Sequence, residues 1–210
     1  MRAAARAATR LVWTPLDFRQ AVRFADAVAD TWLVRTLYLR LADGLDPAHA
    51  ARIRALNATP IDLAALLALP PNTFGHAFAR FIRDNGIAVG GQVKACPELA
   101  DTLAHNWVMD RFVRVHDFHH TLFGVSADPV SEAALQAFNF ANFREPFGAM
   151  GIVATPLVMR AYGEWRRTVR GTVRGIRTGR ACPNLLWHPY EEWWADDLDV
   201  VRARVGIARE

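Results

Sequence analysis

The stretch from His116 to Glu132 constrains the fold of this chain more than any other. His116 and His120 are four residues apart, so on an α-helix they lie one turn above each other on the same face. Along a continuous helix Glu132 would be about 18 Å beyond His120. Gly124 is a typical helix stop, and Asp128 followed by a proline is a typical helix start. The sequence therefore predicts two helices joined by a turn, with Glu132 folded back opposite the histidines.

The side chains of this stretch suit a single divalent metal ion. The candidate ligands are two imidazoles and two carboxylates: His116, Asp117, His120 and Glu132. Asp117 projects about 100° round the helix from His116, close enough to bind an ion at the edge of that face. Nitrogen and carboxylate ligands suit a borderline divalent ion such as zinc, iron, manganese or cobalt, and ligand softness alone does not choose among them. We expect zinc first, with magnesium as a further alternative. The other interpretation of the spacing is two unrelated histidines.

An apolar stripe continues the spacing of the histidines upstream. Its members are Ala104, Val108 and Phe112. We therefore expect His116 and His120 to point inward, where imidazoles and carboxylates are costly to bury without a cation or complete pairing.

Composition and the helix start and stop signals predict one all-α domain, a multi-helix bundle, over residues 15–210. A flexible basic tail is expected before it, over residues 1–14. Strand patterns are almost absent, and 52% of the residues are hydrophobic. The net charge is only +4 and the basic residues are scattered among acids, which argues against a nucleic-acid-binding protein. Two cysteines without a Cys-x-x-Cys pair indicate a reducing compartment, and we expect a cytoplasmic protein, with peripheral contact to the inner membrane face as an option.

Proline, glycine and capping residues mark the expected helices. The first helix is expected over residues 15–41. Later starts are expected at Asp46-Pro47, Thr59-Pro60, Asn72 or Thr73, Pro97 and Pro129, with stops at Pro70-Pro71, Asn85-Gly86 and Arg144-Glu145-Pro146. Isolated histidines outside the 116–132 stretch are expected to be surface or hydrogen-bonded residues: His49, His76 and His105.

Three further segments have two or more interpretations. Residues 146–159 carry no charge, but they are shorter than the roughly 20 residues of a membrane span, so they are a core helix, the wall of an apolar tunnel or an interfacial segment. Gly171, Gly175 and Gly179 indicate a close helix crossing with a stop at Gly179. The aromatic residues at 187–194 either dock on the body of the protein or form a lipid-headgroup belt. The arginines at 2, 6 and 10 likewise fit a soluble tail or contact with anionic lipid.

The spacing His-Asp-x-x-His-x(11)-Glu resembles the signature of the coenzyme Q biosynthesis protein 4 family. Residues 69–75, followed by Phe78-Ala79-Arg80-Phe81, are similar to the Leu-Pro-x-x-(Ser/Thr)-x-Gly segment of that family. Residues 114–117, 184–190 and 198–207 also resemble it, and the likeness extends over about residues 30–207.

The resemblance implies a role in ubiquinone biosynthesis. It implies either metal-dependent oxidative decarboxylation at ring carbon one of a polyprenylated hydroxybenzoate, a lyase-type activity, or a non-catalytic, isoprenoid-binding scaffold that organises other quinone-biosynthesis enzymes at the membrane. Under the enzymatic reading His116, Asp117, His120 and Glu132 hold the ion, and Asp117 or Glu132 also accepts a proton. A homodimer is a further implication. His119, on another face, is assigned a supporting or structural role.

A third candidate class is an all-α phosphohydrolase with a His-Asp metal pair. It would need another histidine upstream and a distant aspartate. His76 or His105 with Asp196 would have to serve, and nothing in their sequence context supports this.

Overall fold

The computed structural model describes residues 28, 31–87 and 106–207. The predicted basic tail over residues 1–14 lies outside them, as do Ala104, His105 and Cys96. The α-helices are α3 (Trp32–Arg40), α4 (Pro47–Ala58), α5 (Leu63–Leu67), α6 (Phe74–Asp84), α9 (Trp107–Phe123), α10 (Pro129–Phe143), α11 (Pro146–Tyr162), α12 (Trp165–Ala181) and α13 (Leu198–Arg204). Two short 3₁₀ helices, η1 (Leu185–Trp187) and η2 (Tyr190–Glu192), precede α13. Within these ranges there is no strand beyond one isolated bridge, between Thr73 and Asp197, and the predicted all-α fold is confirmed.

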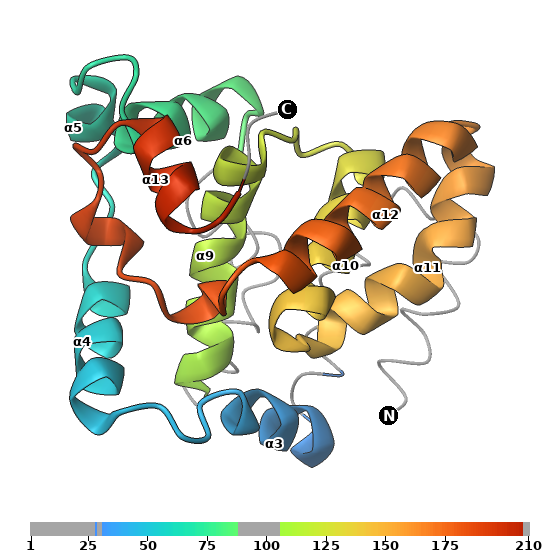
Figure 1. Ribbon diagram of the computed structural model, residues 1–210, viewed down its shortest axis with the longest axis horizontal. Coiled ribbons are helices and arrows are strands. Elements are labelled where there is room, and N and C mark those ends of the chain that lie inside the picture. The colour runs from blue at the N-terminus through green and yellow to red at the C-terminus, as the bar shows by residue number, and fades with distance from the viewer. Residues whose placement is uncertain (1–27, 29–30, 88–105, 208–210) are drawn as a thin grey trace.

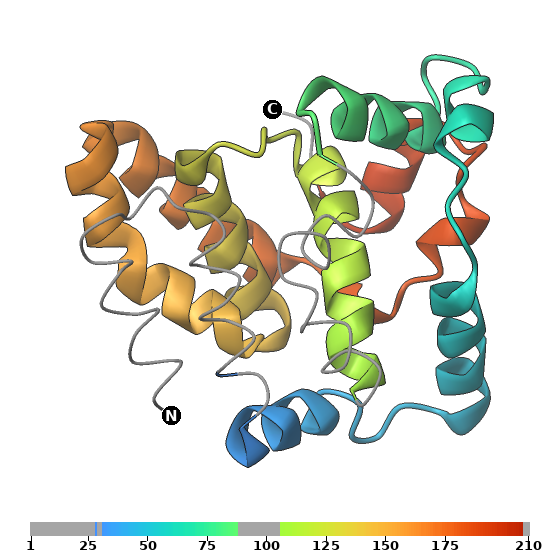
Figure 2. The same cartoon turned by 180° about the vertical axis from the view of Figure 1, so that it is seen from behind.

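Helix α9 stands between two groups of helices (Figures 1 and 2). On one side lie α4, α6 and α13, and on the other α10, α11 and α12 form a separate layer. Helix α3 crosses near the N-terminal end of α9. Buried residues of α9 contribute to the hydrophobic core from Val108 to Phe123. This central position lets α9 present side chains to both groups.

Aromatic side chains fill the space between α9, α6 and the C-terminal segment. Trp194 stacks on Phe74 with ring centroids 5.1 Å apart, and Phe118 meets the edge of Phe78 at 5.0 Å. Tyr190 is fully buried. The C-terminal aromatic residues therefore dock on the body of the protein, as the first of the two interpretations predicted.

An arginine on α9 is buried completely and paired. Arg111 donates to Glu191 at 2.6 Å and also to the backbone carbonyls of Leu186 and His188. Arg114 donates to the same Glu191 carboxylate at 2.8 Å. Because a buried guanidinium is tolerated only with nearly every donor satisfied, this pairing fixes the C-terminal segment against α9.

Glycines let α10 and α12 approach closely. A Cβ atom on Gly175 would lie 2.2 Å from the Ala134 carbonyl oxygen, and one on Gly179 would lie 2.6 Å from that of Phe138. The predicted close crossing is therefore confirmed. Gly179 is not the stop, however, because α12 continues to Ala181 and the Cys182 N–H donates to the Thr178 carbonyl.

Several predicted boundaries were wrong for local reasons. Thr59 ends α4 instead of starting a helix, because Asp62 is the residue whose side chain accepts from the first N–H groups of α5. The first described helix begins after Thr31, which caps Val34 N–H, so residues 15–41 do not form one uninterrupted helix. Likewise the histidine-bearing helix begins at Trp107, after the cap Asn106, and not at Pro97.

The charge-free segment at 146–159 is helical but is not a core helix. Helix α11 runs through Pro156 to Tyr162, and only Gly148 and Thr155 of its residues are buried. Val153 is 80% exposed. None of the helices in the described ranges has the length and apolar character needed to cross a membrane.

Candidate metal centre

The turn between α9 and α10 is built by the residues that the sequence singled out. Gly124 ends α9 with φ +68°, a left-handed conformation in which glycine avoids the steric cost of a side chain. Asp128 then caps α10 by accepting from the N–H groups of Val130 and Ser131, with Pro129 at the first helical position. Glu132 consequently falls in the first turn of α10.

This turn brings Glu132 back to both histidines. His116 Nε2 lies 3.2 Å from Glu132 Oε1, and His120 Nε2 lies 3.0 Å from Glu132 Oε2. One ligand atom from each of the three residues lies within 4.8 Å of the other two. We refer to His116, His120 and Glu132 as the ligand cluster. Its imidazoles are buried, whereas the Glu132 side chain is 35% exposed, so the cluster reaches the surface on the Glu132 side.

Opposite charges within the ligand cluster shift the pKa values of His116 and Glu132 strongly. Burial opposes a charge on His116, but the Glu132 carboxylate and the nearby Asp117 overcome it and raise the His116 pKa to about 9. Burial likewise opposes the Glu132 charge, and attraction to the two imidazoles holds the Glu132 pKa well below its usual range. A positive charge at this position therefore satisfies the carboxylate, whether a proton or a metal ion provides it.

Asp117 lies near the ligand cluster but is not one of its three members in this structure. Burial raises its pKa, and the charges of His116 and His120 act in the opposite direction. The carboxylate is therefore close enough to interact electrostatically with both imidazoles. Its role as a fourth ligand stays a prediction.

The residues present fit a divalent ion. A tetrahedral zinc with bonds of about 2.0–2.1 Å separates its ligand atoms by roughly 3.3 Å, close to the observed 3.0 and 3.2 Å. The Nε2 atoms of both histidines face the same carboxylate. The donor set of two nitrogens and one or two oxygens suits zinc or another borderline divalent metal.

Side chains around the ligand cluster include two that the sequence did not indicate. Gln136 donates to Glu132 Oε1 at 2.6 Å, and Asn139 lies 3.5 Å from His116 Nδ1. Both follow Glu132 on one face of α10, four and seven residues later, and this helical spacing was the signal available. His119, predicted to be supporting or structural, is fully buried and lies 3.1 Å from Asn139 Oδ1. Burial lowers the His119 pKa to about 3.

A second buried carboxylate, which the sequence also did not indicate, lies at the start of α11. Glu145 is fully buried, caps α11 by accepting from the N–H groups of Phe147 and Gly148, and accepts from the Tyr38 hydroxyl. Burial raises its pKa to about 7, and these hydrogen bonds oppose the shift. Glu145 thus joins α3 to α11.

Two of the isolated histidines, His49 and His76, make their hydrogen bonds outside the ligand cluster. His49 Nε2 lies 2.8 Å from the Trp187 carbonyl oxygen, and His76 Nδ1 lies 3.1 Å from those of Leu67 and Leu69. Both histidines are therefore hydrogen-bonded residues, as predicted.

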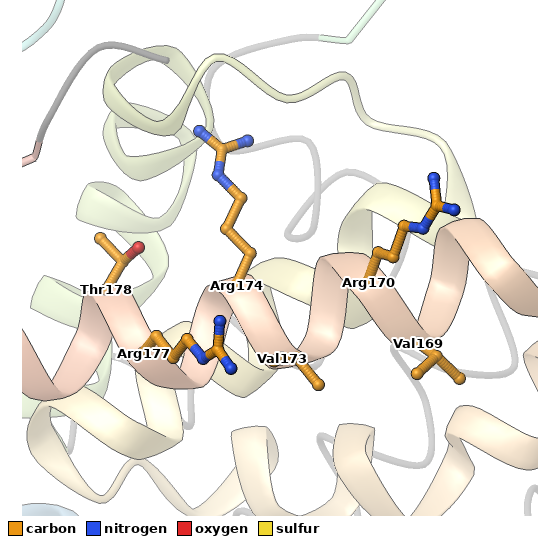
Figure 3. Close-up of a pocket in the computed structure, with 6 residues that line it drawn as sticks. All are labelled: Val169, Arg170, Val173, Arg174, Arg177 and Thr178. Atoms are coloured by element: carbon orange, nitrogen blue, oxygen red, sulfur yellow. The ribbon is translucent and has the colours of Figure 1, made fainter.

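A pocket of about 420 Å³ lies along α12 and shares no residue with the ligand cluster (Figure 3). It is lined by Val169, Arg170, Val173, Arg174, Arg177 and Thr178. Arg170 and Arg174 extend to one side of the helix and Val169 and Val173 to the other. The predicted apolar tunnel therefore does not correspond to this pocket.

Comparison with known proteins points to one family. A sequence model described as coenzyme Q (ubiquinone) biosynthesis protein Coq4 matches residues 50–210. The chain is 30% identical over 191 residues to "Ubiquinone biosynthesis protein coq4, mitochondrial" of Pyrenophora tritici-repentis, covering 89% of this chain and 64% of that protein. It is 26% identical over 153 residues to the corresponding Rattus norvegicus homologue, covering 73% of this chain and 57% of that protein. The chain thus spans under two thirds of the length of these relatives.

The fold has a solved counterpart. A crystal structure of a Nostoc punctiforme protein superposes with a TM-score of 0.76 at 19% sequence identity, covering 99% of this chain and 98% of that one. At this identity the likeness concerns the arrangement of the helices alone.

Proposed function

Since the chain belongs to the coenzyme Q (ubiquinone) biosynthesis protein Coq4 family, we propose that it acts in ubiquinone biosynthesis through a divalent metal ion held between α9 and α10. The observation that carries the proposal is the convergence of His116 Nε2, His120 Nε2 and the Glu132 carboxylate. Asp117 is the proposed fourth ligand or the proton acceptor beside the ion. Zinc is the first choice of metal, followed by iron, manganese, cobalt or magnesium.

The proposed reaction replaces the carboxyl group on ring carbon one of a polyprenylated hydroxybenzoate with a hydroxyl group. With water as the oxygen source, the conversion releases one carbon dioxide, two protons and two electrons, so an electron acceptor such as dioxygen must take part. A bound divalent ion supplies a Lewis acid that would hold the substrate carboxylate or phenolate. Asp117 or Glu132 is proposed to accept a proton.

The substrate tail is proposed to lie along apolar helix surfaces next to the ligand cluster. Each methylene that leaves water contributes roughly 0.8 kcal/mol to binding. The helices proposed to provide this surface are α10 and α11, which are rich in apolar residues. An isoprenoid tunnel beside these helices stays a proposal.

The test is turnover by purified protein reconstituted with each divalent metal and given a prenylated hydroxybenzoate under air. The hydroxylated ring and carbon dioxide should appear together, and His116→Ala should abolish both while retaining the helical circular dichroism signal. His49→Ala, which removes a histidine hydrogen-bonded to the Trp187 carbonyl and away from the cluster, serves as the matched control. No product with any metal would reject the enzymatic proposal.

A second candidate is a non-catalytic scaffold that binds isoprenoid lipid and other quinone-biosynthesis proteins at a membrane. The observation that favours it is the exposure of large apolar side chains on α11 and α12, namely Val153, Trp165 and Val169. Helix α12 adds six arginines and no acid. The scaffold predicts that His116→Ala unfolds the protein or releases its partners, with no turnover to lose.

The subcellular location and the oligomeric state of this chain are also proposals. The relatives named above are mitochondrial proteins by name. For this chain we propose a cytoplasmic position, peripheral on the inner membrane face, and a homodimer. Sedimentation with and without anionic vesicles would separate these states.

A further inference from the structure

A chain of polar groups runs behind the ligand cluster from His116 to a backbone carbonyl. The Asn139 amide lies 3.5 Å from His116 Nδ1 and 3.1 Å from His119 Nδ1. On the other edge of the ring, His119 Nε2 lies 3.4 Å from the Tyr190 hydroxyl, which donates to the Leu185 carbonyl at 2.9 Å. His119, Asn139 and Tyr190 are all 0% exposed, so no solvent completes their hydrogen bonds. We call this chain the polar relay.

The direction of the polar relay is fixed at its Leu185 end. A carbonyl oxygen can only accept, so the Tyr190 hydroxyl uses its single hydrogen there. Toward His119 the Tyr190 oxygen can then only accept, and His119 Nε2 must carry a proton.

His119 carries no second proton. It is fully buried and surrounded by the rings of Phe138, Phe143 and Tyr190. The two groups that face its ring nitrogens, the Asn139 amide and the Tyr190 hydroxyl, are both uncharged. A neutral His119 with its proton on Nε2 has a lone pair on Nδ1, and this lone pair needs a donor.

Asn139 provides that donor and transmits the direction to His116. The structure turns the amide nitrogen toward His116, but a rotation of 180° exchanges oxygen and nitrogen within the same space. Only the rotated amide gives every group in the relay a complementary partner. Its NH₂ then donates to His119, and its oxygen faces His116 Nδ1, which must carry a hydrogen.

We infer that the polar relay holds the proton on His116 Nδ1, so that Nε2 is the nitrogen that gives up its proton and offers its lone pair to a metal ion in the ligand cluster. Asn139 is thus a positioning residue for the metal ligand, with His119 and Tyr190 acting through it. The inference deepens the proposed metal site and rests on it.

The second histidine of the cluster has no such support. His120 Nδ1 is buried without a hydrogen-bond partner among the described residues, and the ring is held by stacking on Phe81 at 5.1 Å. A change at Asn139 therefore acts on one ligand and leaves the other as it was. Residues that hold the far nitrogen of a ligating histidine typically contribute 10- to 100-fold to metal affinity.

The direct test is long-range ¹H–¹⁵N NMR on protein with ¹⁵N-labelled histidine, with and without zinc. We expect His119 to be neutral with its proton on Nε2 in both samples, and zinc-bound His116 to keep its proton on Nδ1. A proton on Nδ1 of His119, or a doubly protonated His119, overturns the relay. Because the metal-free sample reports on His119, a protein that binds no zinc would fail the proposed function and still decide this inference.

Variants provide the second test, with zinc affinity measured by competition with a chromophoric chelator. Asn139→Leu should weaken zinc binding 10- to 100-fold, and Asn139→Asp, which restores an acceptor for His116 Nδ1, should stay within about threefold of the wild type. The control is Asn72→Leu, since the exposed Asn72 amide donates to Asp197 Oδ2 at 2.8 Å and contacts no residue of the relay. Equal zinc affinities for Asn139→Leu and Asn72→Leu would overturn the inference. If Asn139→Leu does not fold, Asn139→Asp and the NMR spectra of the wild type decide it.

Discussion

The pKa values of two carboxylates, Glu132 and Glu145, shift in opposite directions because their neighbours differ. Glu132 faces two imidazoles, which hold its pKa well below the usual range against the effect of burial. At Glu145 burial has the larger effect and raises the pKa to about 7, although Tyr38 and two backbone N–H groups donate to the carboxylate and the charge of His116 acts in the same direction as these donors. At the scale of single residues, the surroundings of a carboxylate therefore decide whether it is suited to binding a cation or to holding a proton.

The Glu145 shift predicts a pH dependence of stability. Since its pKa rises from 4.5 to about 7 on folding, the folded state holds the proton more tightly than the unfolded state. Its contribution is complete below pH 4.5 and is lost as the pH rises to about 7, by about 3 kcal/mol in all. Glu145→Gln cannot lose a proton, so the difference in unfolding free energy between wild type and variant should shift by that amount across the window. Urea titrations at several pH values measure it, and a constant difference would contradict the assignment.

The His116 shift predicts how metal affinity depends on pH. Below its pKa of about 9 the metal-free His116 carries a proton that a metal ion must displace. Zinc affinity should therefore rise by about tenfold per pH unit up to that pKa, with close to one proton released per ion. Calorimetry in buffers of different ionisation enthalpy counts the protons. A flat affinity between pH 6.5 and 9 would show that His116 is already neutral.

At the scale of helices, the crossing of α10 and α12 depends on glycine. A Cβ on Gly175 would lie 2.2 Å from a backbone carbonyl that cannot move alone, whereas one on Gly171 would lie 3.0 Å from the Ala134 side chain. The two positions are one turn apart on the same helix, and a Gly→Ala change improves helix propensity by about 1 kcal/mol at either.

Gly175→Ala should therefore lower the unfolding free energy by about 1–3 kcal/mol, because the helices must move apart. Gly171→Ala should be close to neutral, since the clash is milder and the propensity gain offsets it. Denaturant midpoints of the two variants and the wild type provide the measurement. Equal stabilities of the two variants would mean that the crossing has room to spare.

At the scale of the molecule, an ion pair between Arg111 and Glu191 joins segments that are far apart in the sequence. The pair joins the middle helix to the C-terminal segment and is almost completely buried, with side-chain exposures of 0% and 5%. The adjacent Glu192 pairs with Arg52 at the surface, where the two side chains are 37% and 52% exposed. The neighbouring glutamates therefore make a buried and an exposed ion pair within the same short helix.

Glu191→Ala should cost about 3–5 kcal/mol of unfolding free energy, because it leaves a buried guanidinium without a counter-charge. Glu192→Ala should cost less than about 1 kcal/mol. Thermal or urea unfolding of both variants distinguishes the two effects. Comparable losses would indicate that Arg111 finds other partners when Glu191 is removed.

The turn that builds the ligand cluster could be predicted from particular residues. Gly124 and Asp128 act through their own backbone conformation and side-chain hydrogen bonds, so their effects are local and are written in the sequence. The same holds for Thr73 and Asn85 at the ends of α6. The predicted helix start at Thr59-Pro60 was wrong because two possible capping residues, Thr59 and Asp62, lie within four positions of each other. Only the folded chain selects one of them.

The sequence by itself determined the helical class, the turn after Gly124 and the three residues that meet across it, because these follow from helix periodicity and local capping. Only the tertiary structure decided which distant groups lie next to these three residues and next to each other. Asn139, Tyr190 and Glu145 reach their partners across gaps of 20 to 107 residues. It also decided that α11 lies at the surface and that Arg111 is buried. The physical reason is that burial and long-range pairing are properties of the packed chain, and no local pattern encodes which distant group will supply the missing donor or charge.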